Sequence, residues 1–259
     1  MRFLALSISI LFYLVGFSQE LEIKKVSSTN FKEIFTVNKT SKLESGNYLK
    51  IDRQTKDTLI SGTYTDGIKS GIWRYFSKEN ELWMTYNFDR KKLEKLPEEI
   101  SRIDSFVVKR GDSFAYGKVD FPPVYLGFKN EFERILIANF KVPLDICQNG
   151  KSGLSIATFT INKNGIMQDL LPVQILSDEV FSQMKTAIKL IDGDWIPAMV
   201  NGEPVSSQIV LVYDITPSGN KYLFQDKSKA IVVHFQYLGV TKTRKSIGYA
   251  IRSVDFGRE

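Results

Sequence analysis

The strongest constraint on the fold is a series of short aromatic-rich runs separated by glycine turns, between residues 46 and 93. Asp-Gly and Ser-Gly pairs at residues 66–67 and 70–71 mark two of these turns, where glycine supplies the positive φ that tight hairpins require. From residue 72 to residue 76, Trp73 and Tyr75 fall on one face of a pleated strand. The block is therefore predicted to form consecutive β-hairpins.

One unit of this block has a recognisable pattern. It reads Gly62-Thr63-Tyr64, then Asp66-Gly67, then Gly71-Ile72-Trp73-Arg74-Tyr75. Residues 46–93 thus resemble the MORN family of repeats, although the neighbouring units are degenerate. We interpret the aromatic side chains as repeat core, because a short meander needs large apolar groups to be stable. Residues 19–45 are weakly patterned and predict a strand or an irregular lead-in.

A different texture occupies residues 121–216. Residues 128–138 and 178–191 carry apolar side chains at helical spacing. Residues 154–161 alternate as a strand does, before a turn at residues 162–165. This pattern predicts two helices on a small antiparallel sheet, so the fold class expected for the chain is α+β, with an N-terminal β-meander.

Two further regions flank this predicted domain. Residues 94–120 read as a connector followed by a hairpin, and residues 217–259 follow a break rich in Pro, Ser and Gly. The second region is predicted to be a β-rich extension with strands at 230–238 and 247–254. No family resemblance accompanies this extension.

The closing part of residues 121–216 carries the second resemblance. It reads Trp195-Ile-Pro-Ala198 and then Asn201-Gly-Glu-Pro204, after Phe121-Pro-Pro123 and the turn that ends at Gly165. This series resembles the periplasmic C-terminal domain of the TonB energy-transducer family. The resemblance implies a non-catalytic module that adds an extended partner segment to a sheet edge. The implied partner is an envelope or outer-membrane protein, such as a TonB-dependent transporter.

The same resemblance suggests where the partner binds. We expect the exposed edge at the last strand of the domain, and its residues are Ser207, Gln208, Ile209, Val210, Leu211, Val212 and Tyr213. The alternative is that the C-terminal extension covers this edge, since exposed edges are usually protected. The motif residues from Trp195 to Pro204 are interpreted as structural.

The N-terminus predicts export. Arg2 precedes an apolar run from Phe3 to Val15, and small residues follow it, so residues 1–18 are interpreted as a signal peptide cleaved before Gln19. The run is shorter than the roughly 20 residues that span a bilayer. We therefore expect a periplasmic or envelope protein of a Gram-negative bacterium. The alternative is an uncleaved inner-membrane anchor, which would be the only route to membrane association.

A true energy transducer is an alternative function. Transducers of the TonB family have a transmembrane anchor and a long proline-rich spacer, whereas here only Pro97 lies between Gln19 and Phe121. An adaptor that binds envelope proteins is therefore the leading hypothesis.

Catalytic and metal-binding patterns are sparse. His234 is the only histidine and Cys147 the only cysteine, so a zinc site is not expected and no internal disulfide can form. No Gly-x-Ser-x-Gly or phosphate-binding glycine motif occurs. Asp192 and Asp194 are interpreted as turn residues rather than a paired-carboxylate or calcium site. We predict no enzyme activity, cofactor or metal, and a secreted enzyme remains a second alternative.

The net charge of +6 could attract nucleic acid. However, lysine and arginine are interleaved with acidic residues along the chain, and no basic–aromatic signature of nucleic-acid binding is present. Nucleic acid is therefore not predicted as a partner.

Overall fold

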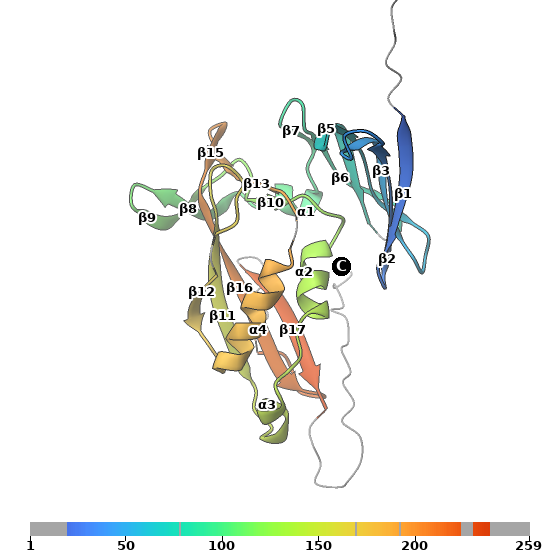
Figure 1. Ribbon diagram of the computed structural model, residues 1–259. Coiled ribbons are helices and arrows are strands. Elements are labelled where there is room, and N and C mark those ends of the chain that lie inside the picture. The colour runs from blue at the N-terminus through green and yellow to red at the C-terminus, as the bar shows by residue number, and fades with distance from the viewer. Residues whose placement is uncertain (1–19, 78, 169, 192, 224–229, 239–259) are drawn as a thin grey trace, which may run out of the picture.

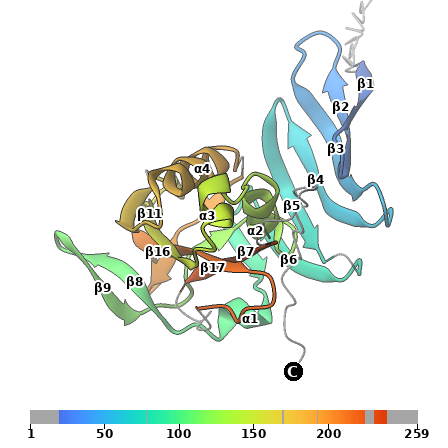
Figure 2. The ribbon, with the colours of Figure 1, turned by 90° about the horizontal axis from the view of Figure 1, so that it is seen from below.

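The computed structural model describes residues 20–77, 79–168, 170–191, 193–223 and 230–238. The predicted signal peptide and the predicted strand 247–254 lie outside these ranges. Two β-sheets form the body of the protein, with the N-terminal sheet beside the half that carries the helices (Figures 1 and 2).

The N-terminal sheet is a seven-stranded antiparallel meander whose spatial order follows the sequence. The predicted lead-in is part of it, because residues 21–38 form two regular strands. The seven strands are β1 (Leu21–Ser27), β2 (Phe31–Asn38), β3 (Glu44–Asp52), β4 (Thr58–Thr65), β5 (Ile68–Phe76), β6 (Leu82–Asn87) and β7 (Lys92–Lys95).

The meander packs around Trp73, which is 2% exposed. Its ring stacks on Tyr48 at 5.3 Å between centroids and meets the edge of Tyr64 at 5.2 Å. Gly62 lies directly against it, since a Cβ at residue 62 would come within 2.2 Å of Trp73 Cδ2. The aromatic residues therefore pack together in the core of the meander, as predicted. The absence of a side chain at Gly62 leaves space for the Trp73 ring.

The second sheet has the order β12-β11-β16-β8-β9, and β17 also pairs with β16. Its strands are β8 (Ser105–Arg110), β9 (Ser113–Lys118), β11 (Gly153–Ile161), β12 (Leu171–Gln174), β16 (Ser207–Pro217) and β17 (Ile231–Tyr237). Two short ribbons complete the half: β10 (Val124–Tyr125) pairs with β13 (Trp195–Ile196), and β14 (Ala198–Val200) with β15 (Glu203–Val205). The β8–β9 hairpin projects from the body (Figures 1 and 2).

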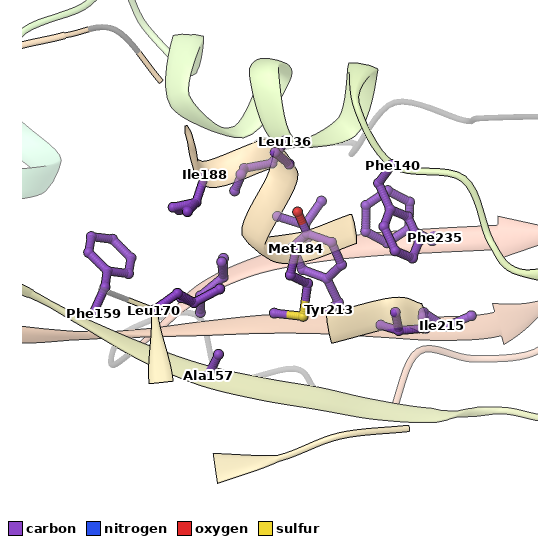
Figure 3. Packing of buried hydrophobic residues seen from close by; sticks show 14 of the residues in the cluster. Leu136, Phe140, Ala157, Phe159, Leu170, Met184, Ile188, Tyr213, Ile215 and Phe235 are labelled. Atoms are coloured by element: carbon purple, nitrogen blue, oxygen red, sulfur yellow. The ribbon is translucent and has the colours of Figure 1, made fainter. Parts of the chain in front are cut away.

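The helices of the described residues are short. They are α1 (Glu98–Ser101), α2 (Glu131–Ala138), α3 (Leu144–Gln148) and α4 (Asp178–Lys189). Ser177 caps α4, because its side chain accepts a hydrogen bond from Val180 N–H. Leu136 of α2 and Met184 of α4 share a buried cluster with Tyr213 and Phe235 of the sheet (Figure 3). The main core therefore lies between the helices and the sheet.

The predicted α+β fold class is wrong. Strands make up 50% of the described residues and helices only 14%, and both sheets are large. The lead-in, predicted as a strand or an irregular segment, forms the two regular strands β1 and β2. The strand predicted at 230–238 is β17, which joins the second sheet. The first helix is also shorter than predicted, because Asn130 adopts a φ of 64° and Phe128 stays outside α2. The described part of the chain is mainly β, and its two longest helices, α2 and α4, cover one face of the second sheet.

The two halves share an apolar core. Leu59, Trp73 and Met84 of the meander belong to the same buried cluster as Val124 and Phe128 of the second half. Phe31 meets Phe128 edge to face at 5.4 Å between ring centroids. Because these rings would be exposed if the halves separated, the meander and the helical half are expected to move as one body.

Charged groups close this interface. Lys50 Nζ on β3 lies 2.6 Å from Glu131 Oε1 on α2, and their side chains are only 16% and 6% exposed. Arg134 adds its guanidinium over Phe31, 5.3 Å from the ring centroid. A second contact joins Lys69 Nζ to Asp194 Oδ2 at 2.7 Å. Removal of one charge of the buried pair is expected to destabilise the interface, because the remaining charge would lose its nearest partner.

Candidate functional site

The strand predicted to be an exposed edge lies inside the sheet. Residues 207–213 belong to β16, which pairs antiparallel with β11 from Ser207↔Ile161 to Ile215↔Gly153. On its other side, β16 pairs in parallel with β17, from Leu211↔Ile231 onward, and with β8 at Ser207↔Val108. The predicted binding edge is therefore closed by the chain itself, and an incoming strand could not pair there.

Most side chains of this strand are also buried, whereas Gln208 and Val210 are half-buried. Ile209 and Leu211 belong to the core, and Tyr213 is fully buried between Phe140 and Phe235. Burial raises the pKa of Tyr213 far above its ordinary value. The predicted site residues thus stabilise the fold instead of facing a partner.

The motif residues have structural roles. Trp195 is 8% exposed and packs at 5.4 Å, between ring centroids, against Phe132. Asn201 and Gly202 have φ values of 52° and 79° and form the turn of the β14–β15 hairpin. Gly165 passes so close to Trp195 that a Cβ there would lie 2.1 Å from the Trp195 carbonyl oxygen. The motif therefore marks close packing and turn geometry.

The open edge on the other flank of the sheet is β12. It pairs with β11 on one side, and no strand of the described residues pairs with its other side. All of its residues are exposed, including Leu171 at 58% and Val173 at 64%. Leu171 lies opposite Thr158, on the sheet face turned away from the helices, because Ala157 and Phe159 point into the core.

This edge was missed because strand order cannot be read from local periodicity. The local pattern of residues 167–176 does not show whether the outer side of a strand formed there is open. The signal that could have indicated an edge is Pro172, which cannot donate a hydrogen bond and is confined to edge strands and bulges.

His234 lies on β17 opposite Asp214 on β16. Its Nδ1 atom is 3.4 Å from Asp214 Oδ2, and the two side chains are 5% and 0% exposed. Tyr222 covers the imidazole with 3.9 Å between ring centroids. This arrangement joins the last two strands. Among the residues that the structure describes, no group of three or more His, Cys, Asp or Glu side chains comes together to hold a metal.

Of the two aspartates interpreted as turn residues, the structure describes only Asp194. Asp194 forms its ion pair with Lys69 across the interface, and the Leu126 N–H donates to the Asp194 carbonyl oxygen at 2.9 Å. Asp192 lies outside the described residues, so the structure does not test the two acids as a pair.

Cys147 is buried in the core at the end of α3, and burial raises the pKa of its thiol. Because the thiolate is the reactive form, we expect the native protein to resist iodoacetamide at pH 7–8. The rate should rise with pH, since a raised pKa shifts ionisation upward. Mass spectrometry after timed labelling checks this, with the urea-unfolded protein as the fully reactive control. Rapid modification of the native protein would show that α3 opens readily.

Comparisons with protein-family models, with curated proteins and with solved structures give no match to this chain. The resemblances to the TonB C-terminal domain and to MORN repeats therefore stay predictions from the quoted motifs. Within the described ranges, no helix has the length and apolar composition needed to cross a membrane.

Proposed function

We propose that this chain is a non-catalytic adaptor of the cell envelope that binds an extended segment of another envelope protein as a strand added to β12. The observation that carries the proposal is the open β12 edge, with Leu171 and Val173 each more than half exposed. The resemblance to the TonB C-terminal domain supports the class of partner, an extended segment of an outer-membrane or envelope protein. The predicted signal peptide supports the compartment.

Strand addition at this position has a clear physical basis. An added strand pairs its main chain with the outer side of β12, while its alternate side chains lie on the exposed apolar row. Burial of Leu171 and Val173 supplies the favourable free energy. Because β12 has only four residues and Pro172 lacks an N–H group, its outer side can form only a few main-chain hydrogen bonds. We therefore expect weak and reversible binding.

The join between the halves supports an adaptor over an energy transducer. A transducer needs an extended spacer between its anchor and its binding domain, and the meander occupies that stretch of the chain. It is folded against the second half through a shared apolar core and the Lys50–Glu131 pair. A folded block of this kind spans a shorter distance than an extended spacer and fixes the position of the two halves relative to each other. Both properties suit a scaffold.

Site-specific photo-crosslinking in intact cells tests the proposal. A photoreactive residue at Leu171 should form a discrete adduct with an envelope protein. Val173→Lys should reduce that adduct by about tenfold or more, because an added strand would bury the new charge. Both residues are exposed, so the folded state should be unaffected.

The matched control is Tyr116→Lys on β9, another edge strand with a residue 54% exposed. It should leave the Leu171 adduct unchanged. An adduct that survives Val173→Lys, or the absence of any adduct at Leu171 when the protein is present at its normal level, would contradict binding at β12.

A further inference from the structure

The first strand of the meander presents a second open edge. β1 pairs with β2 in an unbroken antiparallel register from Leu21↔Asn38 to Ser27↔Lys32. Within the described residues, no strand pairs with its other side, and all seven of its side chains are exposed. It lies at the border of the sheet farthest from the helices (Figures 1 and 2). An open edge of this length is a template for another strand.

The hydrogen bonds of β1 show which main-chain groups face outward. Glu20 C=O accepts from Lys39 N–H, and Ser28 N–H donates to Phe31 C=O, each at 2.9 Å. Hydrogen-bonded pairs alternate along an antiparallel ladder. Even-numbered residues of β1 therefore bond to β2, and the odd-numbered residues 21, 23, 25 and 27 direct their N–H and C=O groups to the open edge.

Charge restricts what can pair there. Two copies of β1 related by a two-fold axis overlap over at least five residues of the strand when the axis lies on Ile23, Lys24 or Lys25, and over fewer when it lies nearer either end. Centring on Glu22, Lys24 or Lys25 places like charges directly opposite each other, which is unfavourable. Centring on Ile23 instead places Ile23 against Ile23 and each Glu22 against Lys24 of the other copy. Every outward main-chain group from Leu21 to Lys25 then finds a partner.

We propose that β1 is a self-association surface, on which a second copy of this chain pairs antiparallel with Ile23 on the two-fold axis. The two meanders then form one continuous sheet. Within one copy, Lys24 Nζ already lies 2.7 Å from Glu22 Oε1. In the dimer the same charges meet across the strands in non-hydrogen-bonded pairs, whose Cα atoms approach to about 4.5 Å. Lys24 and Lys25 disfavour the registers centred on them, so charge favours the register centred on Ile23.

Reversal of single charges tests this register. Sedimentation analysis of the purified protein should show concentration-dependent dimers. Glu22→Lys or Lys24→Glu should each weaken the dimer about tenfold, because two like-charge pairs replace two attractive pairs. The double variant E22K/K24E exchanges the charges and should restore association to near the wild-type level. All three substitutions lie on exposed positions, so folding should be retained.

A cysteine at the axis gives an independent readout. Ile23→Cys should form an intermolecular disulfide on mild oxidation, since Cα atoms of a hydrogen-bonded pair lie about 5.5 Å apart, within disulfide range. The wild type, whose single Cys147 is buried, should form none. Val26→Cys should crosslink poorly, because Val26 faces residue 20 in this register.

Three results would overturn the proposal. They are a wild type that stays monomeric at every concentration, single reversals that associate as the wild type does, and a charge exchange that fails to restore the dimer. Val173→Lys should not affect dimers, so loss of partner binding at β12 and loss of self-association at β1 are separately measurable. Dimers abolished by Val173→Lys would also contradict the assignment to β1.

Discussion

Replacing Trp73 by alanine is expected to lower the free energy of unfolding by about 3–5 kcal/mol, the range typical of buried tryptophan truncations. The side chain is 2% exposed and contacts Tyr48, Tyr64 and Phe88 through its ring. Its Nε1–H donates to the Thr63 carbonyl oxygen at 3.2 Å, and truncation loses this bond. Urea denaturation followed by circular dichroism measures the change.

The neighbouring glycine provides the matched test. Gly62→Ala should also destabilise the protein, because the added methyl group would overlap the Trp73 ring. Combined with Trp73→Ala, the same methyl enters vacated space, so the double variant should lose less than the sum of the two single variants. Additive losses would mean that the two residues do not contact each other in solution.

Replacing Glu131 by leucine is expected to cost about 3 kcal/mol of unfolding free energy, at the low end for a broken buried ion pair. The change leaves the Lys50 ammonium with Glu33 at 3.8 Å, and it removes the acceptor of the Phe128 N–H group. Lys50 is 16% exposed, and this residual solvation moderates the loss. Denaturant titration of the Glu131→Leu variant and of the wild type measures the loss of unfolding free energy.

A double replacement and a surface pair serve as controls. Lys50→Met combined with Glu131→Leu removes both charges and should recover part of the lost stability, because no unpaired charge stays buried. Glu98→Gln breaks the exposed Glu98–Arg102 pair and should change stability little. If Glu131→Leu behaves like Glu98→Gln, the interface pair contributes nothing to holding the halves together.

These predictions treat the molecule as one folded body, which the sequence did not indicate. The MORN-like block and the TonB-like region were interpreted as consecutive domains with a connector between them. Phe31 and Phe128 show why the join was missed. Each is an ordinary apolar residue in its own segment, and only the fold brings their rings to 5.4 Å.

Local features were predicted well. The helix predicted at residues 178–191 is α4, which begins at Asp178 behind its Ser177 cap and ends at Lys189. The hairpin turn at Asn201 and Gly202 lies where the sequence indicates it. The strand 154–161 is β11. Capping, positive φ and alternation depend on neighbouring residues, so one segment carries the whole signal.

Strand order was predicted poorly, and the candidate site depended on it. Ser207–Tyr213 was correctly interpreted as a strand, but its exposure depended on residues twenty positions further along the chain, at Ile231–Tyr237. The continuous apolar run from Ile209 to Tyr213 suits a central strand as well as an edge. The same ambiguity concealed β12 and β1, whose open sides follow from what their neighbours pair with.

The amino-acid sequence alone determined several hairpin turns, the longest helix and which large side chains are buried in the meander, although the turn predicted at residues 70–71 lies inside β5. These properties follow from short-range backbone preference and side-chain polarity. The tertiary structure decided which strands lie at the edges, that β17 closes the side of β16, and that the two halves share a core. Such outcomes depend on pairing between distant segments, where several partners satisfy the same local pattern and only packing of the whole chain selects one.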